Sequence, residues 1–116
     1  MAIAKGIKRK VSHHRRILSK KIVKLSQVGV GDIIQFSYSN KDVYDKTPLV
    51  LILQKKTGVV EGINLNYLKE FLVQSLLSET NWKNMKRYSM YKNAFRTYKV
   101  SKIGIINEIE YKRNNT

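Results

Sequence analysis

The 116-residue sequence contains no cysteine, one proline and only eight acidic residues. The lack of cysteine excludes disulfides, thiolate metal sites and a thiol nucleophile. The two histidines, His13 and His14, are adjacent, so on a helix their side chains would point about 100° apart and chelate one metal ion poorly. The sequence has no further histidine that could act as the general base of a Ser–His triad. We therefore predict no metal, no cofactor and no nucleophilic catalysis.

Long apolar segments are also missing. The longest apolar run covers residues 49–53, which is far too short to cross a bilayer. The N-terminus lacks the apolar stretch of a secretory signal. Its basic, acid-free composition also fits an organelle transit peptide, but the C-terminal third is equally basic. We expect a chain that is neither secreted nor membrane-embedded.

Positive charge is abundant, and it is concentrated at the two ends of the chain. The net charge of +15 divides into +9 for residues 1–25, −1 for residues 26–80 and +7 for residues 81–116. Solubility alone calls for modest and interspersed charge rather than unmixed blocks. Each Lys or Arg that neutralises a phosphate releases counterions, so basic segments bind nucleic acid without reading its sequence. The pattern predicts a neutral centre that supplies the fold and cationic ends that meet a polyanion.

Residues 12–25 are predicted to form a basic amphipathic helix. Ser12 is a suitable N-cap, and Ile17, Leu18, Ile22 and Leu25 follow at helical spacing, with cations over much of the remaining surface. Such a helix packs on the domain with its cations toward phosphate, or lies on an anionic membrane. The absence of aromatic anchors on the apolar face favours packing on the domain over membrane binding. We divide the chain into a basic N-terminal arm and helix, residues 1–25, and a single β-rich domain, residues 26–116.

The centre of the chain has the pattern of a β-rich fold. Strands are predicted over residues 33–39, 49–54 and 59–67, a helix over 68–79, and a last strand within 100–111. Gly62, inside the third of these strands, indicates a bulge or a close backbone approach. The order predicts a mainly β fold with helices (α+β), in the form of a small SH3-like half-open β-barrel with an inserted helix.

Three segments carry a resemblance to a known family. They are YDKTPLVLIL (44–53), GINLNYL (62–68) and FRTYK (95–99). This pattern resembles a family of small tailed-bacteriophage proteins linked with head completion and DNA ends. The resemblance implies a virion or DNA-packaging setting, multiple copies in a particle, and a location in the virion or the host-cell cytoplasm. Gly31-Asp32 and Pro48 are also similar to toxin endoribonucleases with an SH3-like barrel, but Thr47 stands where those enzymes usually carry arginine.

A metal-dependent nuclease is a second possibility. It needs carboxylates that converge on Mg²⁺ beside a lysine, here Lys46, and the first loop would have to fold over the third strand. The candidate carboxylates are Asp32, Asp42, Asp45 and Glu61. Alternatively, Asp32 is a turn residue, Asp45 accepts backbone hydrogen bonds ahead of Pro48, and Glu61 is solvated. No acidic pair has a tight, motif-like spacing, which favours these structural roles.

Residues 82–99 interleave aromatic and basic side chains. Such a strip could stack exposed bases while its cations follow the phosphate backbone. The aromatic residues could instead belong to the core. We favour the core for the aromatic residues and nucleic-acid contact for the cations, because phosphate contact requires only exposure.

Taken together, these patterns predict a non-enzymatic structural component that contacts nucleic acid in a large assembly, with a tailed-phage virion as its setting. The expected partners are nucleic acid, DNA rather than RNA, and acidic surfaces of other proteins. A small nuclease and an RNA-bound ribosomal-type protein are the alternatives. The predicted binding residues are Lys5, Lys8, Arg9, Lys10, His13, Arg15, Arg16, Lys20 and Lys21 in the N-terminal segment, with Arg87, Arg96 and Lys99 in a second patch.

Overall fold

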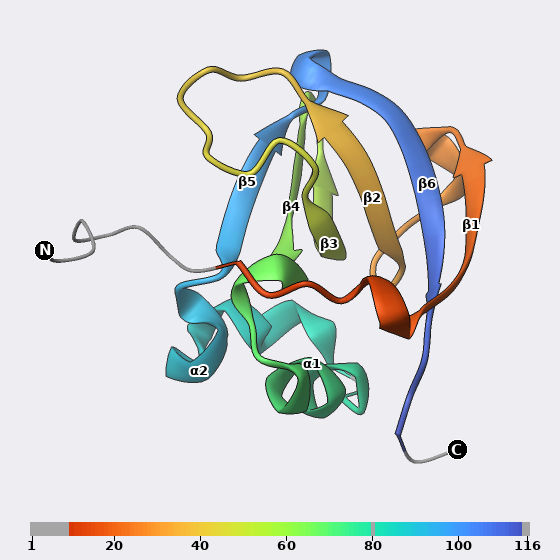
Figure 1. Ribbon diagram of the computed structural model, residues 1–116. Helices are drawn as coiled ribbons and strands as arrows, with labels where there is room; N and C mark the ends of the chain where they lie inside the picture. Colours follow the sequence, from red (N-terminus) through yellow and green to blue (C-terminus); the bar gives the residue numbers. More distant parts are fainter. Residues whose placement is uncertain (1–9, 80, 115–116) are drawn as a thin grey trace, which may run out of the picture.

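The computed structural model describes residues 10–79 and 81–114, which form one six-stranded antiparallel sheet with two short α-helices (Figure 1). The strands are β1 (Ile17–Val23), β2 (Ile33–Tyr38), β3 (Leu49–Lys56), β4 (Val59–Asn64), β5 (Phe95–Lys99) and β6 (Ile103–Tyr111). The helices are α1 (Glu70–Leu77) and α2 (Ser89–Lys92), with 3-10 turns η1 (His14–Arg16), η2 (Leu25–Gln27), η3 (Leu65–Tyr67), η4 (Trp82–Arg87) and η5 (Val100–Lys102).

The strand order is β1-β6-β2-β3-β4-β5, so β1 and β5 are the two ends of the sheet. The predicted mainly β, α+β class is confirmed. The sheet is bent, but it is not closed into a barrel, because its two end strands do not pair with each other. The strands predicted over residues 33–39 and 49–54, the last strand within 100–111 and a helix within 68–79 are present. The strand predicted over 59–67 ends at Asn64, where η3 begins, and β5 was not predicted as a strand.

Apolar side chains cover both faces of the sheet. Strand β3 shows why: Leu49, Leu51 and Leu53 belong to one buried cluster, whereas Val50 and Ile52 belong to another. Because successive side chains of a strand point to opposite faces, the two clusters lie on opposite sides of the sheet. The first cluster includes residues of α1 and α2, and the second is completed by β2, β5 and the loops around η2. The continuous apolar run thus forms the doubly buried strand that its composition predicts.

The helix predicted for residues 12–25 is wrong. Residues 14–16 form a single 3-10 turn, and Ile17–Val23 form β1, which pairs antiparallel with β6. In a helix, Arg16, Lys20 and Lys24 would lie four residues apart on one face, where like charges are destabilising. As a strand, the segment hydrogen-bonds along β6 and sends neighbouring cations to opposite faces. Pairing with β6 therefore overrides the helical spacing of the apolar residues.

The hairpin of β3 and β4 depends on two glycines. Gly58 has a φ of 78°, a left-handed conformation suited to glycine in the tight turn after Thr57. A side chain at Gly62 would collide with the carbonyl oxygen of Leu51 and with a methyl group of Val50. The register of β3 and β4 also shifts between Ile52 and Gln54, opposite Gly62 and Glu61. The predicted close approach at Gly62 is confirmed, whereas the bulge lies in β3, at Leu53, opposite Gly62 and Glu61.

No helix in the part of the chain that the structure describes is long and apolar enough to span a membrane.

Candidate nucleic-acid interface

Asp45 links the loop before Pro48 to the segment that contains Asn64 and Asn66. It is only 1% exposed, and its Oδ2 accepts hydrogen bonds from Nδ2 of Asn64 (2.9 Å) and Nδ2 of Asn66 (2.8 Å). Its Oδ1 accepts from the Thr47 backbone N–H (3.0 Å) and from the Lys10 ammonium (2.9 Å). Burial alone would raise the pKa of Asp45, but these four donors outweigh it and the pKa is lowered. The conformation of the loop before Pro48 is fixed by this carboxylate.

Asp45 also brings the start of the described chain to a cluster of cations and tyrosines. The Arg96 guanidinium lies over the ring of Tyr67, with its carbon 4.8 Å from the ring centre. Burial raises the pKa of Tyr67, and the charges of Asp45, Arg96 and Lys10 act on the same hydroxyl. Tyr44, beside Asp45 in the loop, is 67% exposed. We call Lys10, Tyr44, Tyr67 and Arg96 the arm-proximal surface, because the basic residues 1–9 directly precede Lys10 in the sequence.

The predicted binding residues have different environments. Lys5, Lys8 and Arg9 lie outside the described residues. Lys10 is ion-paired with Asp45, and Nε of Arg16 lies 3.3 Å from Oε2 of Glu70. Lys20 donates to Oε1 of Gln35 (3.0 Å). Among the described residues, the exposed cations with no ion-pair partner include Arg15, Lys20, Lys21, Arg87 and Lys99.

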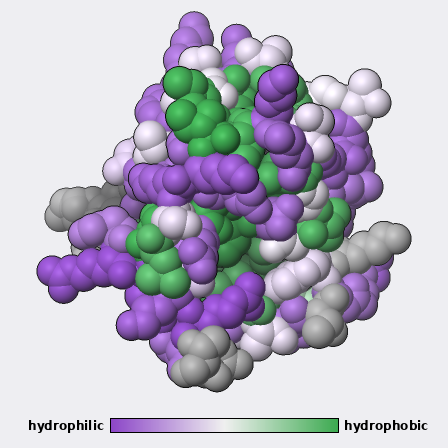
Figure 2. All heavy atoms as spheres, turned by 90° about the vertical axis from the view of Figure 1, so that its right-hand side faces the viewer, coloured by the Kyte–Doolittle hydropathy of each residue, from purple (hydrophilic) through white to green (hydrophobic). Residues whose placement is uncertain are grey.

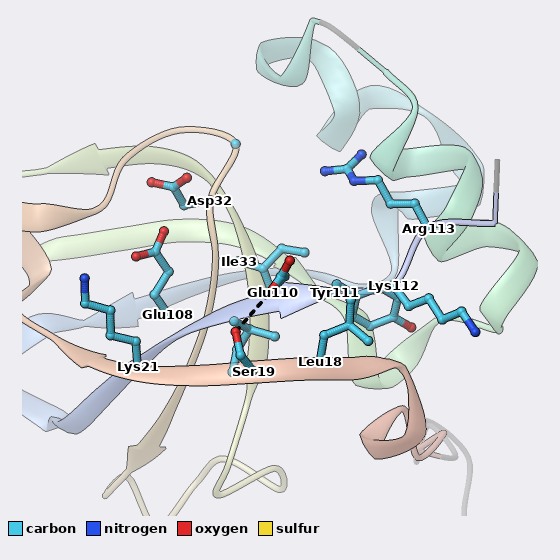
Figure 3. A pocket seen from close by; sticks show the side chains of 12 residues that line it. Leu18, Ser19, Lys21, Asp32, Ile33, Glu108, Glu110, Tyr111, Lys112 and Arg113 are labelled. Carbon is cyan, nitrogen blue, oxygen red and sulfur yellow. Dashed lines mark hydrogen bonds between the residues drawn. The ribbon is translucent and has the colours of Figure 1, made fainter. Parts of the chain in front are cut away.

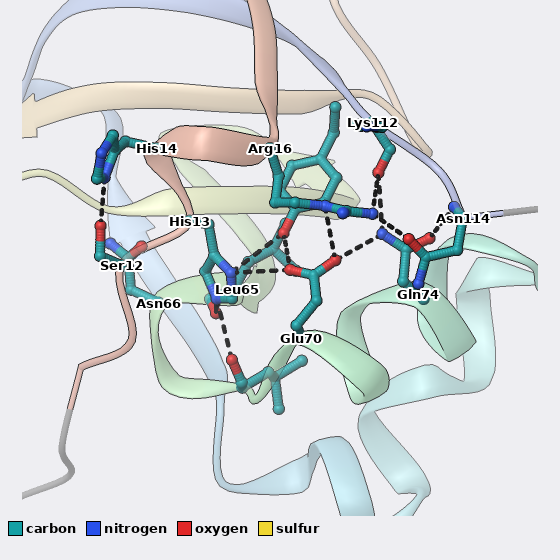
Figure 4. Close-up of polar contacts among 12 residues, drawn as sticks. Ser12, His13, His14, Arg16, Leu65, Asn66, Glu70, Gln74, Lys112 and Asn114 are labelled. Carbon is teal, nitrogen blue, oxygen red and sulfur yellow. Dashed lines mark hydrogen bonds and ion pairs between the residues drawn. The ribbon is translucent and has the colours of Figure 1, made fainter.

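His13 does not face phosphate, and the prediction that it does is wrong. It is 4% exposed, and its Nε2 lies 2.9 Å and 3.0 Å from the carbonyl oxygens of Leu65 and Leu68. Its Nδ1 lies 3.1 Å from both Oε1 of Glu70 and the hydroxyl of Tyr111 (Figure 4). Every polar atom of the ring is therefore used inside the protein. His13 connects the N-terminal segment to η3, α1 and β6, whereas its neighbour His14 is exposed.

Glu70 is the acceptor at the centre of this cluster. The Tyr111 hydroxyl donates to its Oε1 (2.5 Å), and the side-chain amide of Gln74 donates to its Oε2 (2.6 Å). Burial alone would raise the pKa of Glu70, but these bonds and the charges of Arg16 and His13 lower it. Burial and the same hydrogen bond raise the pKa of Tyr111. Arg16 is thus held in an internal network and is a poor candidate for phosphate contact.

A cavity of about 610 Å³ lies between β1, the end of β6 and residues 31–33 (Figure 3). Asp32, Glu108 and Lys21 lie toward one end, and Lys112 and Arg113 toward the other. The register pairs Lys21 with Glu108 across β1 and β6. Acids and bases are equally present on its walls, so the cavity lacks the single charge sign expected of a phosphate site.

The four carboxylates of the predicted nuclease site do not come together. No group of three or more His, Asp or Glu able to hold a metal ion occurs within residues 10–79 and 81–114. Asp32 accepts from the Gly29 backbone N–H (2.9 Å) as a turn residue, and Asp45 is occupied as described above. Glu61 is not solvated as expected, since it is half-buried and lies 3.6 Å from the Lys56 ammonium.

The aromatic residues of the 82–99 strip belong mostly to the core. Tyr91 and Tyr98 are 1% and 2% exposed, and Trp82 and Phe95 are partly buried against the first apolar cluster. Tyr88 is the exception, at 47% exposure. The expected core role of the aromatic residues is confirmed for these buried positions. Arg87 and Lys99 are exposed, as their predicted role requires.

Tyr44 and Tyr67 are the residues of the arm-proximal surface that sequence reasoning did not select as binding residues. Both stood in the resemblance pattern, but contacts between distant segments, among them the hydrogen bonds of Asp45, bring them together with Lys10. The sequence does contain a signal for this grouping, because an aspartate before a turn and two asparagines in a strand are polar residues that need partners if buried.

Comparison with protein-family models, curated proteins and solved structures gives no match to this chain.

Proposed function

We propose that this protein contacts nucleic acid, DNA in preference to RNA, as a non-enzymatic structural component of a large assembly. The arm-proximal surface supports the proposal. It combines an exposed tyrosine, a tyrosine stacked with arginine, and Lys10, the residue that follows the basic residues 1–9. Aromatic rings and guanidinium planes stack on unpaired bases, while neighbouring cations follow the phosphates. The proposed contact is therefore strongest where DNA is single-stranded or has an open end.

The setting that we propose is a tailed-phage virion, in which several copies of the chain lie in the head or neck or on the packaged DNA. The sequence pattern around Asp45 supports this setting only by resemblance. The SH3-like type of the open sheet likewise stays a prediction, as does the location in the virion or the host-cell cytoplasm.

The distribution of the cations supports a diffuse contact. Exposed cations such as Arg15, Lys20, Lys21, Arg87 and Lys99 lie on several elements, with no acid partner in the described chain. Such an arrangement produces a field that attracts phosphate without a fixed docking geometry. The stacking residues of the arm-proximal surface would then position the strand. Specificity would come from the assembly rather than from base readout.

Binding of the full chain to fluorescently labelled single-stranded and duplex DNA of equal length tests this proposal. We expect Arg96→Gln to weaken single-strand binding by about fivefold or more, since stacking and cation contacts are each worth about 1 kcal/mol or more. Tyr67→Leu, which keeps an apolar side chain against the core, should reduce the preference for single strands. Measurements of anisotropy at one fixed salt concentration give both numbers.

Lys112→Gln is the matched control. It removes one positive charge from an exposed position after the end of β6, far from the arm-proximal surface along the sheet. Equal losses of affinity for Arg96→Gln and Lys112→Gln would show that only net charge matters and would contradict the proposed surface. Tighter binding to structured RNA than to DNA in a competition assay would favour the ribosomal-type alternative. Cleavage of either nucleic acid with Mg²⁺ would contradict a non-enzymatic role.

A further inference from the structure

Strand β1 is an end strand that is exposed along almost its whole length. It pairs with β6 on one side, and no other strand in the described residues pairs with its second side. Five of its seven residues are exposed and the two at its ends are half-buried. From Ser19 to Val23 its register with β6 is regular. An end strand of this kind presents a row of backbone N–H and C=O groups on which another strand can form hydrogen bonds.

Exposed apolar side chains accompany this edge. Ile22 on β1 is 72% exposed and Ile105 on β6 is 68% exposed. The register pairs Ile22 with Asn107, so Ile105 lies two residues further along β6 on the same face. Leu18 and Val30, at 58% and 56% exposure, lie on β1 and in the turn before β2. Figure 2, which views this side of the molecule, shows apolar surface broken by long hydrophilic side chains.

The charged side chains of β1 and of Lys24, which follows it, are all basic. Lys20 and Lys24 flank Ile22 on one face of the extended segment, and Lys21 lies on the other face with Ser19 and Val23. No acidic residue occurs before Asp32 in the sequence. Glu108 and Glu110 of β6 lie on the face of Lys21, opposite Lys21 and Ser19, and Ser19 donates to Glu110 (3.1 Å). The face that carries Ile22 and Ile105 therefore has cations and no acid from either strand.

A second copy of the chain is a poor occupant of this edge. Two β1 strands side by side would place lysines of both copies within cross-strand distance, where like charges are destabilising. Lysines on end strands commonly prevent such self-association. The same lysines favour an acidic strand, because opposite charges in cross-strand positions are stabilising.

We propose that the free edge of β1 binds an extended, acidic segment of a partner protein, which adds to the sheet as a further strand. The backbone of β1 supplies the hydrogen bonds, Ile22 and Ile105 supply an apolar contact, and the three lysines select the charge of the partner. This inference rests on the backbone edge of β1 and does not depend on the arm-proximal surface beside β5 at the other end of the sheet, although Lys20 and Lys21 also belong to the exposed cations proposed to attract phosphate.

The register defines the pattern of the partner segment. Opposite Lys24, Val23, Ile22, Lys21, Lys20 and Ser19, an antiparallel strand should carry in turn an acidic, an apolar, an apolar, an acidic, an acidic and a polar residue. A twelve-residue synthetic peptide with Glu-Val-Val-Glu-Glu-Thr at its centre is a suitable probe. A scrambled peptide of the same composition keeps the charge and removes the pattern.

Backbone N-methylation of the peptide gives the sharpest test. In an added strand, alternate N–H groups point toward β1 and the others point toward solvent. We expect methylation of one alternate set to weaken binding to the full-length protein at least tenfold, and methylation of the other set to change it little. Titration calorimetry measures each dissociation constant. Equal affinities for the two methylated peptides would overturn strand addition, as would equal affinity for the scrambled peptide.

Two variants of the protein locate the site. Ile22→Thr keeps a β-branched residue while removing apolar surface, and should weaken the peptide about threefold or more. Phe71→Thr is the control, because Phe71 is 67% exposed on α1, away from the edge. Equal affinity of the peptide for the Ile22→Thr variant and for the unchanged protein would contradict the proposed site. So would a dimer of the free protein that Ile22→Thr dissociates.

Discussion

His13 and His14 are neighbours in the sequence with opposite environments. His13 has both ring nitrogens within hydrogen-bond distance of internal groups, whereas His14 is exposed and lies 2.7 Å from the Ser12 hydroxyl. Because an unsatisfied buried polar group costs far more than an exposed one, the two residues should differ in their contribution to stability. Their adjacency provides a matched pair of substitutions.

The first prediction concerns this pair. His13→Ala should lower the free energy of unfolding by roughly 2–4 kcal/mol, because it removes a donor from the carbonyl oxygens of Leu65 and Leu68 and opens a cavity. His14→Ala should change it by less than about 0.5 kcal/mol. Urea unfolding followed by circular dichroism measures both values. Similar effects of the two substitutions would contradict the structural role of His13.

The second prediction is the pH dependence of stability. The pKa values of Asp45 and Glu70 are lowered from 3.8 and 4.5, so the folded protein binds fewer protons than the unfolded chain in this range. Their contribution is therefore complete above these ordinary values and is lost as the pH falls through the lower folded-state values. We expect stability to fall below about pH 4.5, and to fall less steeply in Asp45→Asn.

Asp45→Asn should also lose about 2 kcal/mol at pH 7, because one of the two accepting oxygens becomes an NH2 group, which faces donors on whichever side it lies. Asp42→Asn is the control, since Asp42 is exposed. Urea midpoints between pH 7 and pH 3 give the slopes. An unchanged slope in Asp45→Asn would show that Asp45 does not titrate as its hydrogen bonds require.

At the scale of elements, the hairpin of β3 and β4 yields the third prediction. Gly62→Ala should destabilise the fold by about 2–3 kcal/mol, because the new methyl group meets the Leu51 carbonyl oxygen, which belongs to the paired backbone and cannot move away freely. Gly29→Ala should be nearly neutral, since no atom lies within 4 Å of the added carbon. Thermal unfolding of both variants checks this, and comparable melting temperatures would argue against the close approach.

Strands whose composition and burial agree could be predicted from the sequence. The run from Leu49 to Leu53 is apolar on both faces, with β-branched residues on one of them, and it became the doubly buried β3. β1 could not be predicted, because its spacing of apolar residues fits a helix and its strand conformation depends on β6, more than 80 residues later in the chain. β5 was missed for a similar reason, since its pairing with β4 is not visible in its own five residues.

The candidate site was only partly predictable. Exposure of basic residues such as Arg87 and Lys99 follows from their type alone, because lysine and arginine are rarely buried without a partner. The burial of His13 and the pairing of Lys10 with Asp45 depend on contacts between segments that are far apart in the sequence. The grouping of Tyr67 with Arg96 likewise arises only when η3 and β5 come together.

At the scale of the whole molecule, charge is the dominant property. The chain has 23 basic and eight acidic residues, and two of the acids, Asp45 and Glu70, are held in internal networks. Most of the positive charge therefore has no counterpart within the protein. Such a charge attracts polyanions over distances of about a Debye length and makes the attraction sensitive to salt.

Salt dependence of DNA binding tests the central claim, that the cationic N-terminal segment and the arm-proximal surface contact phosphate. A full-length variant with Lys5, Lys8, Arg9 and Arg96 replaced by glutamine should bind single-stranded DNA more weakly. The slope of its logarithmic binding constant against the logarithm of salt concentration should be smaller by roughly 0.7 for each phosphate that the variant no longer neutralises. A slope that stays the same as in the unchanged protein would contradict the account.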